Sequence, residues 1–256
     1  MKNIYFLSDA HLGCKAIEHR RTLERRLVRF LDSIKDKAEA VYLLGDMFDF
    51  WFEYTDVVPK GFTRFLGKLS ELTDNGVEVH FFVGSHDMWV GDYLQKECGV
   101  TIHNEPYTAE LHNQIFFIAH GHIIENETNP FLERLMFWCF RNKVLQRLAR
   151  MVHPHWFVSF GYKWAKHSHE RHHIMGAPVY LGENKEKLVV FSKKYLKTHP
   201  NINYFVFGHR HIDLDQQIGT DTHTIILGQW YSLFTYAVFD GATLKIDHYI
   251  EGETKL

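Results

Sequence analysis

The sequence predicts an α/β fold in which a largely parallel sheet carries helices on its faces. Short apolar runs alternate with segments of helical periodicity over the first 120 residues, and five apolar runs in the chain end in Asp or His side chains. Ligands of parallel sheets bind beyond the carboxyl ends of the strands. The polar strand endings therefore indicate where a functional site lies.

Five runs are typical of buried strands that end in a small residue and then a burst of polar side chains. They are IYFLSDAH (4–11), VYLLGDMFD (41–49), FFVGSHD (81–87), FFIAHGH (116–122) and YFVFGHRH (204–211). A buried strand normally ends in a turn of arbitrary polarity. Five endings rich in Asp and His predict that the strand tips meet at one metal site.

Helical periodicity separates these strands. Apolar residues recur at helical spacing from about residue 18 to 35, and again from Phe62 to Leu72, where the pattern closes at Asn75-Gly76. A further helix is expected at about residues 183–197. The last part of the chain predicts strands at 224–227, 234–239 and 244–249.

Residues 129–176 break this alternation with an aromatic and basic segment. They hold eight Arg and Lys residues against two acidic ones, and their apolar residues surround too much of a helix for a simple amphipathic element. We predict a helical cap inserted into one domain, formed by residues 1–128 and 177–256. The cap suits a substrate with acyl chains and a diphosphate, or an anionic membrane surface. A small core with a solvated basic face is the alternative.

The composition argues against several classes of protein. The formal net charge is −2, which does not suit a protein that coats nucleic acid, although the cap leaves single-strand binding as a weak alternative. Cys14, Cys98 and Cys139 form no CxxC pair and fit a reducing compartment. No stretch approaches the roughly 20 apolar residues that cross a bilayer. We expect a cytoplasmic protein, and a peripheral contact with the inner membrane surface stays open.

The residue types at the strand endings suit divalent transition metals. Asp9 and His11 are two residues apart, as are His209 and His211, so both members of each pair can point the same way. Asp46 has two carboxylate oxygens that can bridge two cations. Mixed carboxylates and imidazoles fit Mn, Fe or Zn better than Ca. Each motif alone is common by chance; together they favour two-metal hydrolysis of a phosphate ester or anhydride.

The strand endings resemble the signature blocks of calcineurin-like metallophosphoesterases. The blocks are Ser8-Asp9-Ala10-His11, Gly45-Asp46-Met47-Phe48-Asp49, Gly84-Ser85-His86-Asp87, His120-Gly121 and Gly208-His209-Arg210-His211. Asp49-Phe50-Trp51, the cap after His120 and Gly228-Gln229-Trp230 resemble, more narrowly, the UDP-2,3-diacylglucosamine pyrophosphatases of lipid A synthesis. The resemblance implies a sandwich of β-sheets flanked by helices. It also implies hydrolysis of UDP-2,3-diacylglucosamine to UMP and an acylated glucosamine 1-phosphate.

The resemblance implies roles for the polar residues as well. Asp9, His11 and His211 hold one metal in this reading, His120 and His209 hold the other, and Asp46 bridges them. The expected cofactors are two divalent ions, Mn²⁺ first, with Fe or Zn as alternatives.

The catalytic and substrate-binding roles follow from the same resemblance. His86 is expected to stabilise the phosphate or protonate a leaving oxygen, and Asp49 to orient the ring of His86. Arg210 is a candidate phosphate contact, or equally a solvated turn residue. The expected substrate contacts in the cap are Trp138, Arg141, Lys163 and Trp164.

Two residues depart from the family pattern. Ser85 stands where the family has an asparagine whose carbonyl binds the second metal, and a hydroxyl is a weaker, shorter ligand. His122 stands where the pyrophosphatases have Asp, which makes it a candidate substitute ligand or a simple loop histidine. These departures leave two alternatives open: a phosphoesterase for another nucleotide or phosphodiester, and a degenerate member that binds a phosphorylated lipid without turnover.

Overall fold

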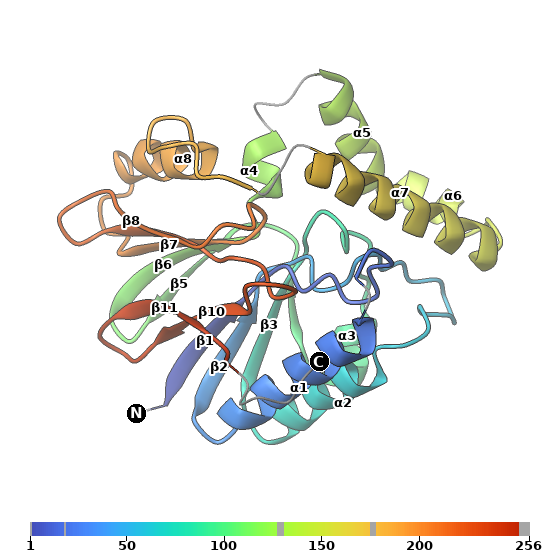
Figure 1. Cartoon of the computed structure of the whole chain (residues 1–256), viewed down its shortest axis with the longest axis horizontal. Helices are drawn as coiled ribbons and strands as arrows, with labels where there is room; N and C mark the ends of the chain where they lie inside the picture. Colours follow the sequence, from blue (N-terminus) through green and yellow to red (C-terminus); the bar gives the residue numbers. More distant parts are fainter. Residues whose placement is uncertain (1, 18, 127–130, 175–177, 251–256) are drawn as a thin grey trace.

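The chain folds into two β-sheets that pack face to face between layers of helices (Figure 1). The computed structural model describes residues 2–17, 19–126, 131–174 and 178–250. The first sheet has the order β11-β10-β1-β2-β3-β4 and the second the order β5-β6-β7-β9-β8. The sandwich implied by the family resemblance is confirmed. The five polar strand endings thus come from two sheets, three from one and two from the other.

The strands have the following bounds. In the first sheet they are β1 Asn3–Leu7, β2 Ala38–Leu43, β3 Glu78–Phe82, β4 Thr101–His103, β10 Thr235–Phe239 and β11 Leu244–His248. In the second they are β5 Tyr107–Leu111, β6 Gln114–Ala119, β7 Tyr204–Phe207, β8 Leu214–Gln217 and β9 His223–Ile226. Strands β1 to β4 are parallel, as are β6, β7 and β9, whereas β10, β11, β5 and β8 pair antiparallel to their neighbours.

The helices cover the outer faces of the two sheets and one end of the sandwich. Helices α1 (Arg20–Ile34), α2 (Thr63–Asp74) and α3 (Tyr93–Cys98) pack on the first sheet, and α8 (Lys187–Leu196) packs on the second. The short α4 (His122–Asn126) follows β6. Helices α5 (Phe131–Arg141), α6 (Lys143–Ala149) and α7 (Pro154–Ile174) lie beyond the strand ends (Figure 1). None of the described helices combines the length and apolarity that crossing a membrane requires.

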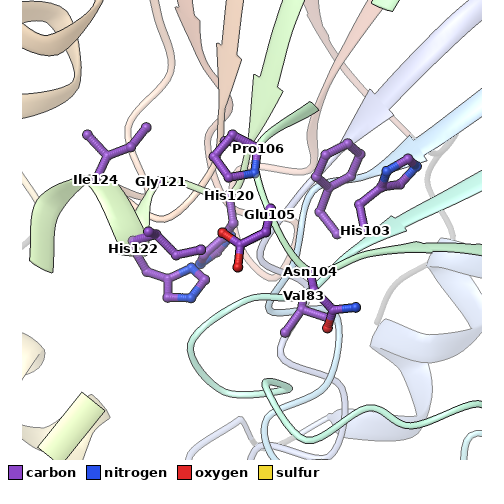
Figure 2. Close-up of a pocket in the computed structure, with 12 residues that line it drawn as sticks. Val83, His103, Asn104, Glu105, Pro106, His120, Gly121, His122 and Ile124 are labelled. Carbon is purple, nitrogen blue, oxygen red and sulfur yellow. The ribbon is translucent and has the colours of Figure 1, made fainter. Parts of the chain in front are cut away.

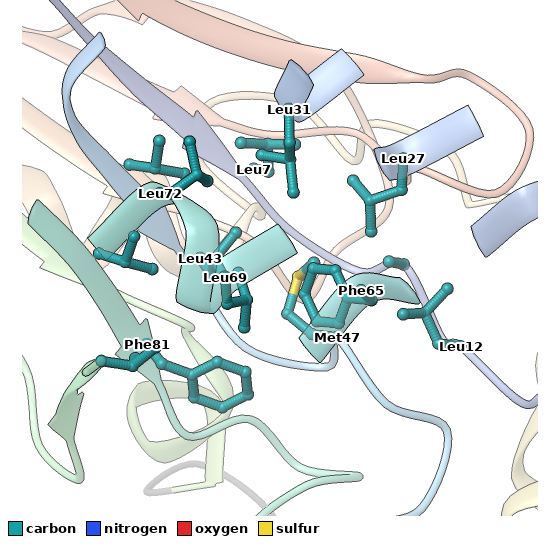
Figure 3. Close-up of a cluster of buried hydrophobic side chains, with 14 of the residues drawn as sticks. Leu7, Leu12, Leu27, Leu31, Leu43, Met47, Phe65, Leu69, Leu72 and Phe81 are labelled. Carbon is teal, nitrogen blue, oxygen red and sulfur yellow. The ribbon is translucent and has the colours of Figure 1, made fainter. Parts of the chain in front are cut away.

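The buried faces explain why the strands are continuously apolar. In β1, Tyr5 and Leu7 face the helical layer, while Ile4 and Phe6 face the second sheet. Because successive side chains of a strand point to opposite faces, burial on both faces removes the polar half of the usual alternation. Leu7 packs in the helical layer near Leu27 and Leu31 of α1 and close to residues of α2 (Figure 3).

The predicted elements are present in the structure, whereas three strands and the short helices α3 and α4 were not predicted. The helices expected at 18–35 and 62–72 are α1 and α2, and Gly76 at φ +77° follows the end of α2. The helix expected at 183–197 begins only at Lys187. Strands β4, β5 and β8 were not predicted, because they are short and hold few buried residues.

The aromatic segment expected as a cap forms α5, α6 and α7 over its described residues 131–174. The remaining residues of the predicted insertion, 129–130 and 175–176, lie outside the described ranges. Polar contacts tie these helices to the sandwich: Trp89 donates from Nε1 to the Phe140 carbonyl (2.6 Å), and Arg150 donates to the Glu53 carbonyl (3.1 Å). The division of the chain into domain and cap stays a prediction.

Candidate metal centre

The five strand endings meet at one place, which lies at the carboxyl ends of the parallel strands. Three groups of side chains have ligand atoms within 4.8 Å of one another: Asp9, His11 and His211; His11, Asp46 and His86; and Asp46, His120 and His209. We call the first of these the first group and the last the second group. His11 and Asp46 are each shared between two groups, so the three groups form one continuous cluster.

The backbone at the cluster is held in an unfavourable conformation. Asp9, His11, Asp46, His209 and His211 have φ values between 44° and 69°. Residues other than glycine seldom adopt this left-handed region, and such strain is concentrated at functional sites. The backbone conformation of these five candidate ligands is therefore unfavourable in free energy, and the packing around them must compensate for it.

The strand tips approach one another too closely for side chains at two glycines. A Cβ atom on Gly84 would overlap the backbone and carboxylate of Asp46, and a Cβ on Gly208 would overlap Ser8 and Asp9. Glycine is the residue that permits such close backbone contact. These two positions bring the ends of β2 and β3, and of β1 and β7, into direct contact.

The first group is built from residues that follow β1 and β7. The Nε2 of His211 lies 3.1 Å from Oδ1 of Asp9 and 3.3 Å from Nε2 of His11. The hydroxyl of Tyr231 lies 3.4 Å from the other ring nitrogen of His211. Burial, assisted by Asp9, raises the pKa of Tyr231 to about 12, so this hydroxyl keeps its proton. The group thus presents a carboxylate and two imidazoles from one side, with Tyr231 behind His211.

Asp46 lies between the two groups and is almost wholly buried. Its Oδ1 accepts a hydrogen bond from the backbone N–H of His86 (2.7 Å), and its Oδ2 accepts one from the Ser85 hydroxyl (2.9 Å). Burial opposes the charged form, but His120 and His86 outweigh burial and hold the pKa of Asp46 well below its usual value. The carboxylate is charged and its two oxygens face different neighbours.

His120 gives a test of whether a cation fits this centre. Its Nδ1 donates to the Leu44 carbonyl (2.6 Å), which leaves Nε2 directed at Oδ2 of Asp46, 3.2 Å away. In the neutral ring this arrangement sets a lone pair against a carboxylate, which is repulsive unless a proton or a cation lies between them. Burial alone disfavours the charged ring, yet Asp46 raises the pKa of His120 to about 9. The site therefore favours positive charge between His120 and Asp46, which a proton or a metal ion can supply.

The imidazoles of His11 and His209 are in the form that binds metal ions. Burial lowers the pKa of His11 to about 4, and burial with the nearby His120 lowers that of His209 to about 3. Neutral imidazoles offer a lone pair to a metal. The Nε2 of His209 lies 3.7 Å from a carboxylate oxygen of Glu125, a placement like the carboxylate–imidazole pairs that orient metal ligands.

His86 and Asp49 are in contact, although mainly through the backbone of Asp49. The Nδ1 of His86 lies 3.0 Å from the Asp49 carbonyl, whereas the Asp49 carboxylate is 3.9 Å from this nitrogen and 3.7 Å from Nδ1 of His11. A carbonyl can only accept, so Nδ1 of His86 carries the proton. The Asp49 carboxylate thus lies near the rings of two candidate site histidines.

Arg210 lies beside the cluster and forms an ion pair with Glu186. Its Nε donates to Oε1 of Glu186 (2.7 Å), and the Glu186 side chain is buried. Glu125 lies 3.5 Å from the same nitrogen. The structure gives Arg210 a local partner, and its expected phosphate contact stays a prediction.

The substrate-binding candidates in the expected cap lie in three different places. The Trp164 ring lies 5.5 Å from the His86 ring, at the cluster. Arg141 forms an ion pair with Glu105, which stands beside the pocket near His120. Trp138 and Lys163 are exposed to solvent. Of the four, Trp164 is therefore the residue that the fold brings to the reactive groups.

An apolar pocket opens beside His86, and the sequence pattern indicated it only in part. Aromatic residues from the sandwich and from α5 and α7 line it together with His86: Phe50, Trp51, Trp89, Phe140, Phe157, Phe160 and Trp164. The abundance of aromatic residues in 129–176 suggested a groove but not its partners from Asp49-Phe50-Trp51 and Trp89. Asp87 was also missed, although it accepts hydrogen bonds from the backbone of Gly84 (2.7 Å) and Met47 (2.9 Å) and so ties β2 to β3.

The chain belongs to the calcineurin-like phosphoesterase family, which its residues 2–213 match. It is therefore a hydrolase, and its clustered Asp and His side chains indicate that it binds divalent metal. It is 41% identical to a UDP-2,3-diacylglucosamine hydrolase of Porphyromonas gingivalis, over 95% of this chain and 96% of that protein. It is 29% identical to the hydrolase of the same name from Vibrio vulnificus, over 94% and 92% of the two chains. With that from Neisseria gonorrhoeae it shares 28% identity over 91% of each chain. The family resemblance of the strand endings is confirmed.

Proposed function

We propose that this chain hydrolyses the pyrophosphate bond of UDP-2,3-diacylglucosamine and releases UMP and 2,3-diacylglucosamine 1-phosphate. One observation carries the proposal: an apolar pocket opens at His86, directly beside clustered metal-binding side chains. Such a pocket suits an acyl chain, and the cluster suits a diphosphate. The names of the relatives, 41% identical in the first case, agree with this substrate.

The first group and Asp46 are proposed to hold one cation, and the second group the other, with Ser85 beside it. When bound, two divalent cations, Mn²⁺ in this proposal and Fe or Zn as alternatives, supply Lewis-acid charge that polarises a phosphoryl group and activates water. Asp46 would contribute to holding both cations, because it groups with His11 and His86 on one side and with His120 and His209 on the other.

His86 is proposed to act on the phosphate. With Nδ1 donating to the Asp49 carbonyl, Nε2 is the nitrogen that can donate a proton to a leaving oxygen or hold a phosphoryl oxygen. Trp164 forms one wall beside this ring and excludes water from it. Arg210 and Arg141 are basic groups near the site that can attract the diphosphate.

The helices α5 to α7 are proposed to cover the substrate and to touch the inner membrane surface from the cytoplasm. They expose large apolar side chains, among them Phe131, Leu132, Met151 and Trp156. Basic residues such as Arg134 and Lys143 are exposed on the same helices. Apolar side chains with a basic surround favour contact with anionic lipid, the phase that supplies a diacylated substrate.

The test compares three substrates with the purified chain in the presence of Mn²⁺. The substrates are UDP-2,3-diacylglucosamine, the same nucleotide sugar without acyl chains, and a simple aromatic phosphodiester. We expect release of UMP from the acylated substrate with a kcat/KM at least tenfold above the other two. Preference for the phosphodiester would support a different phosphoesterase. Turnover of none would support a binding protein.

A further inference from the structure

His122 is a buried histidine, and no described residue pairs with its Nδ1. Its side chain is 6% exposed. An unsatisfied polar atom in the interior costs about 1–3 kcal/mol. Native structures seldom keep such an atom without a reason, and the binding of an ion is one such reason.

The ring of His122 stands beside the second group. Its centroid lies 5.1 Å from the centroid of His120, which is itself 5.1 Å from that of His209, and 6.3 Å separates His122 from His209. Figure 2 shows His122 at the start of α4, next to His120, in a pocket that Glu105 also lines. With nitrogen–metal bonds of about 2.1 Å, two imidazoles on one cation have centroids roughly 4.5–6.5 Å apart. The three ring centroids have this spacing, although His122 is not among the side chains whose ligand atoms all lie within 4.8 Å of one another.

The second group leaves room for another ligand. Asp46, His120 and His209 give three ligand atoms, and the fourth position of a zinc site is taken by a protein side chain in structural sites and by water or substrate in catalytic ones. The Ser85 hydroxyl donates to Oδ2 of Asp46, so it serves the bridging carboxylate. Relative to an asparagine at position 85, one oxygen ligand is missing.

We propose that the second metal site is a three-imidazole site, in which His122 supplies a nitrogen in place of the amide oxygen absent at Ser85. This inference rests on the proposed two-metal centre and names its ligands more closely. One carboxylate with three imidazoles favours Zn²⁺ or Fe²⁺ over Mn²⁺ at this site. The two sites of the chain then differ in metal preference.

The test measures metal binding to His122→Phe, which keeps a ring against Phe137 but removes both nitrogens. The matched control is His103→Phe, since His103 lines the same pocket on its far side. We expect His122→Phe to bind the second equivalent of Zn²⁺ at least about tenfold more weakly, while His103→Phe binds two equivalents as the unaltered chain does. Adding Ser85→Asn to His122→Phe should restore the lost affinity.

A second measurement does not depend on how well a variant folds. The unaltered chain is loaded with NMR-active cadmium, and its histidine ring nitrogens are isotope-labelled. Scalar coupling between cadmium and a ring nitrogen of His122 is the expected result. Two tightly bound equivalents in His122→Phe, or no coupling at His122, would overturn this inference and leave the proposed function intact. An unaltered chain that binds no divalent metal would overturn both.

Discussion

The Nδ1 of His86 donates to the backbone carbonyl of Asp49 across 3.0 Å, so the chain that follows β2 helps to orient this ring. Activity should therefore be sensitive to substitution of His86 itself. The Asp49 carboxylate reaches both His86 and His11 at 3.7–3.9 Å.

We expect His86→Gln to lower kcat on the proposed substrate by about a hundredfold to ten-thousandfold, the usual contribution of a general acid. Because His86 is assigned to the phosphate, both metals should stay bound. Steady-state kinetics and elemental analysis of the purified variant test this together. If the purified His86→Gln variant keeps one metal fully bound and loses the other, His86 is a metal ligand instead.

Tyr231 is predicted to hold His211 in place for the first metal. Tyr231→Phe removes the hydroxyl that lies 3.4 Å from the ring nitrogen of His211, and the affinity of the first site should fall about tenfold. Tyr236→Phe is the control, because its hydroxyl bonds the exposed Asp247. Calorimetric titration measures the affinity of both variants for Mn²⁺. Equal affinities in Tyr231→Phe and Tyr236→Phe would show that Tyr231 does not support the first metal site.

The sequence predicted which Asp and His side chains cluster better than it predicted the residues that support them. Asp9, Asp46 and His120 follow apolar runs directly, so their convergence could be expected from strand order. Tyr231 lies 20 positions beyond His211 and reaches the ring through a loop that no periodicity describes. The alternation of strands and helices alone also predicted one largely parallel sheet. The structure has two sheets, because periodicity does not indicate which strands pair.

Gly161 is predicted to set the fit of the apolar pocket. A Cβ at Gly161 would overlap the ring of Phe50, so Gly161→Ala should displace α7 from the sandwich and raise KM for the acylated substrate several-fold. Gly67→Ala is the matched control, because its Cβ would meet no atom within 4 Å. In the middle of α2 that change should raise the free energy of unfolding by about 0.5–1 kcal/mol. An unchanged KM in Gly161→Ala would contradict the account of the pocket.

The stability of the fold is predicted to fall in acid through the pair of His80 and His103, whose rings meet at 3.0 Å. Burial, and then His80, lowers the pKa of His103 to about 4 from its ordinary 6.5. Between these values the unfolded chain binds more protons, so the free energy of unfolding decreases as pH falls from about 6.5 to 4. Urea denaturation at several pH values should show a shallower decrease in His103→Gln. Equal slopes in both proteins would exclude the pair as the cause.

The central claim is that five strand endings form one metal-dependent phosphoesterase centre. Its most direct test is hydrolysis of UDP-2,3-diacylglucosamine by the chain after chelation and after return of Mn²⁺. We predict that chelation abolishes UMP release, that Mn²⁺ restores it, and that Asp46→Asn, which weakens the shared carboxylate, prevents the restoration. Full UMP release from thoroughly chelated protein would contradict the claim.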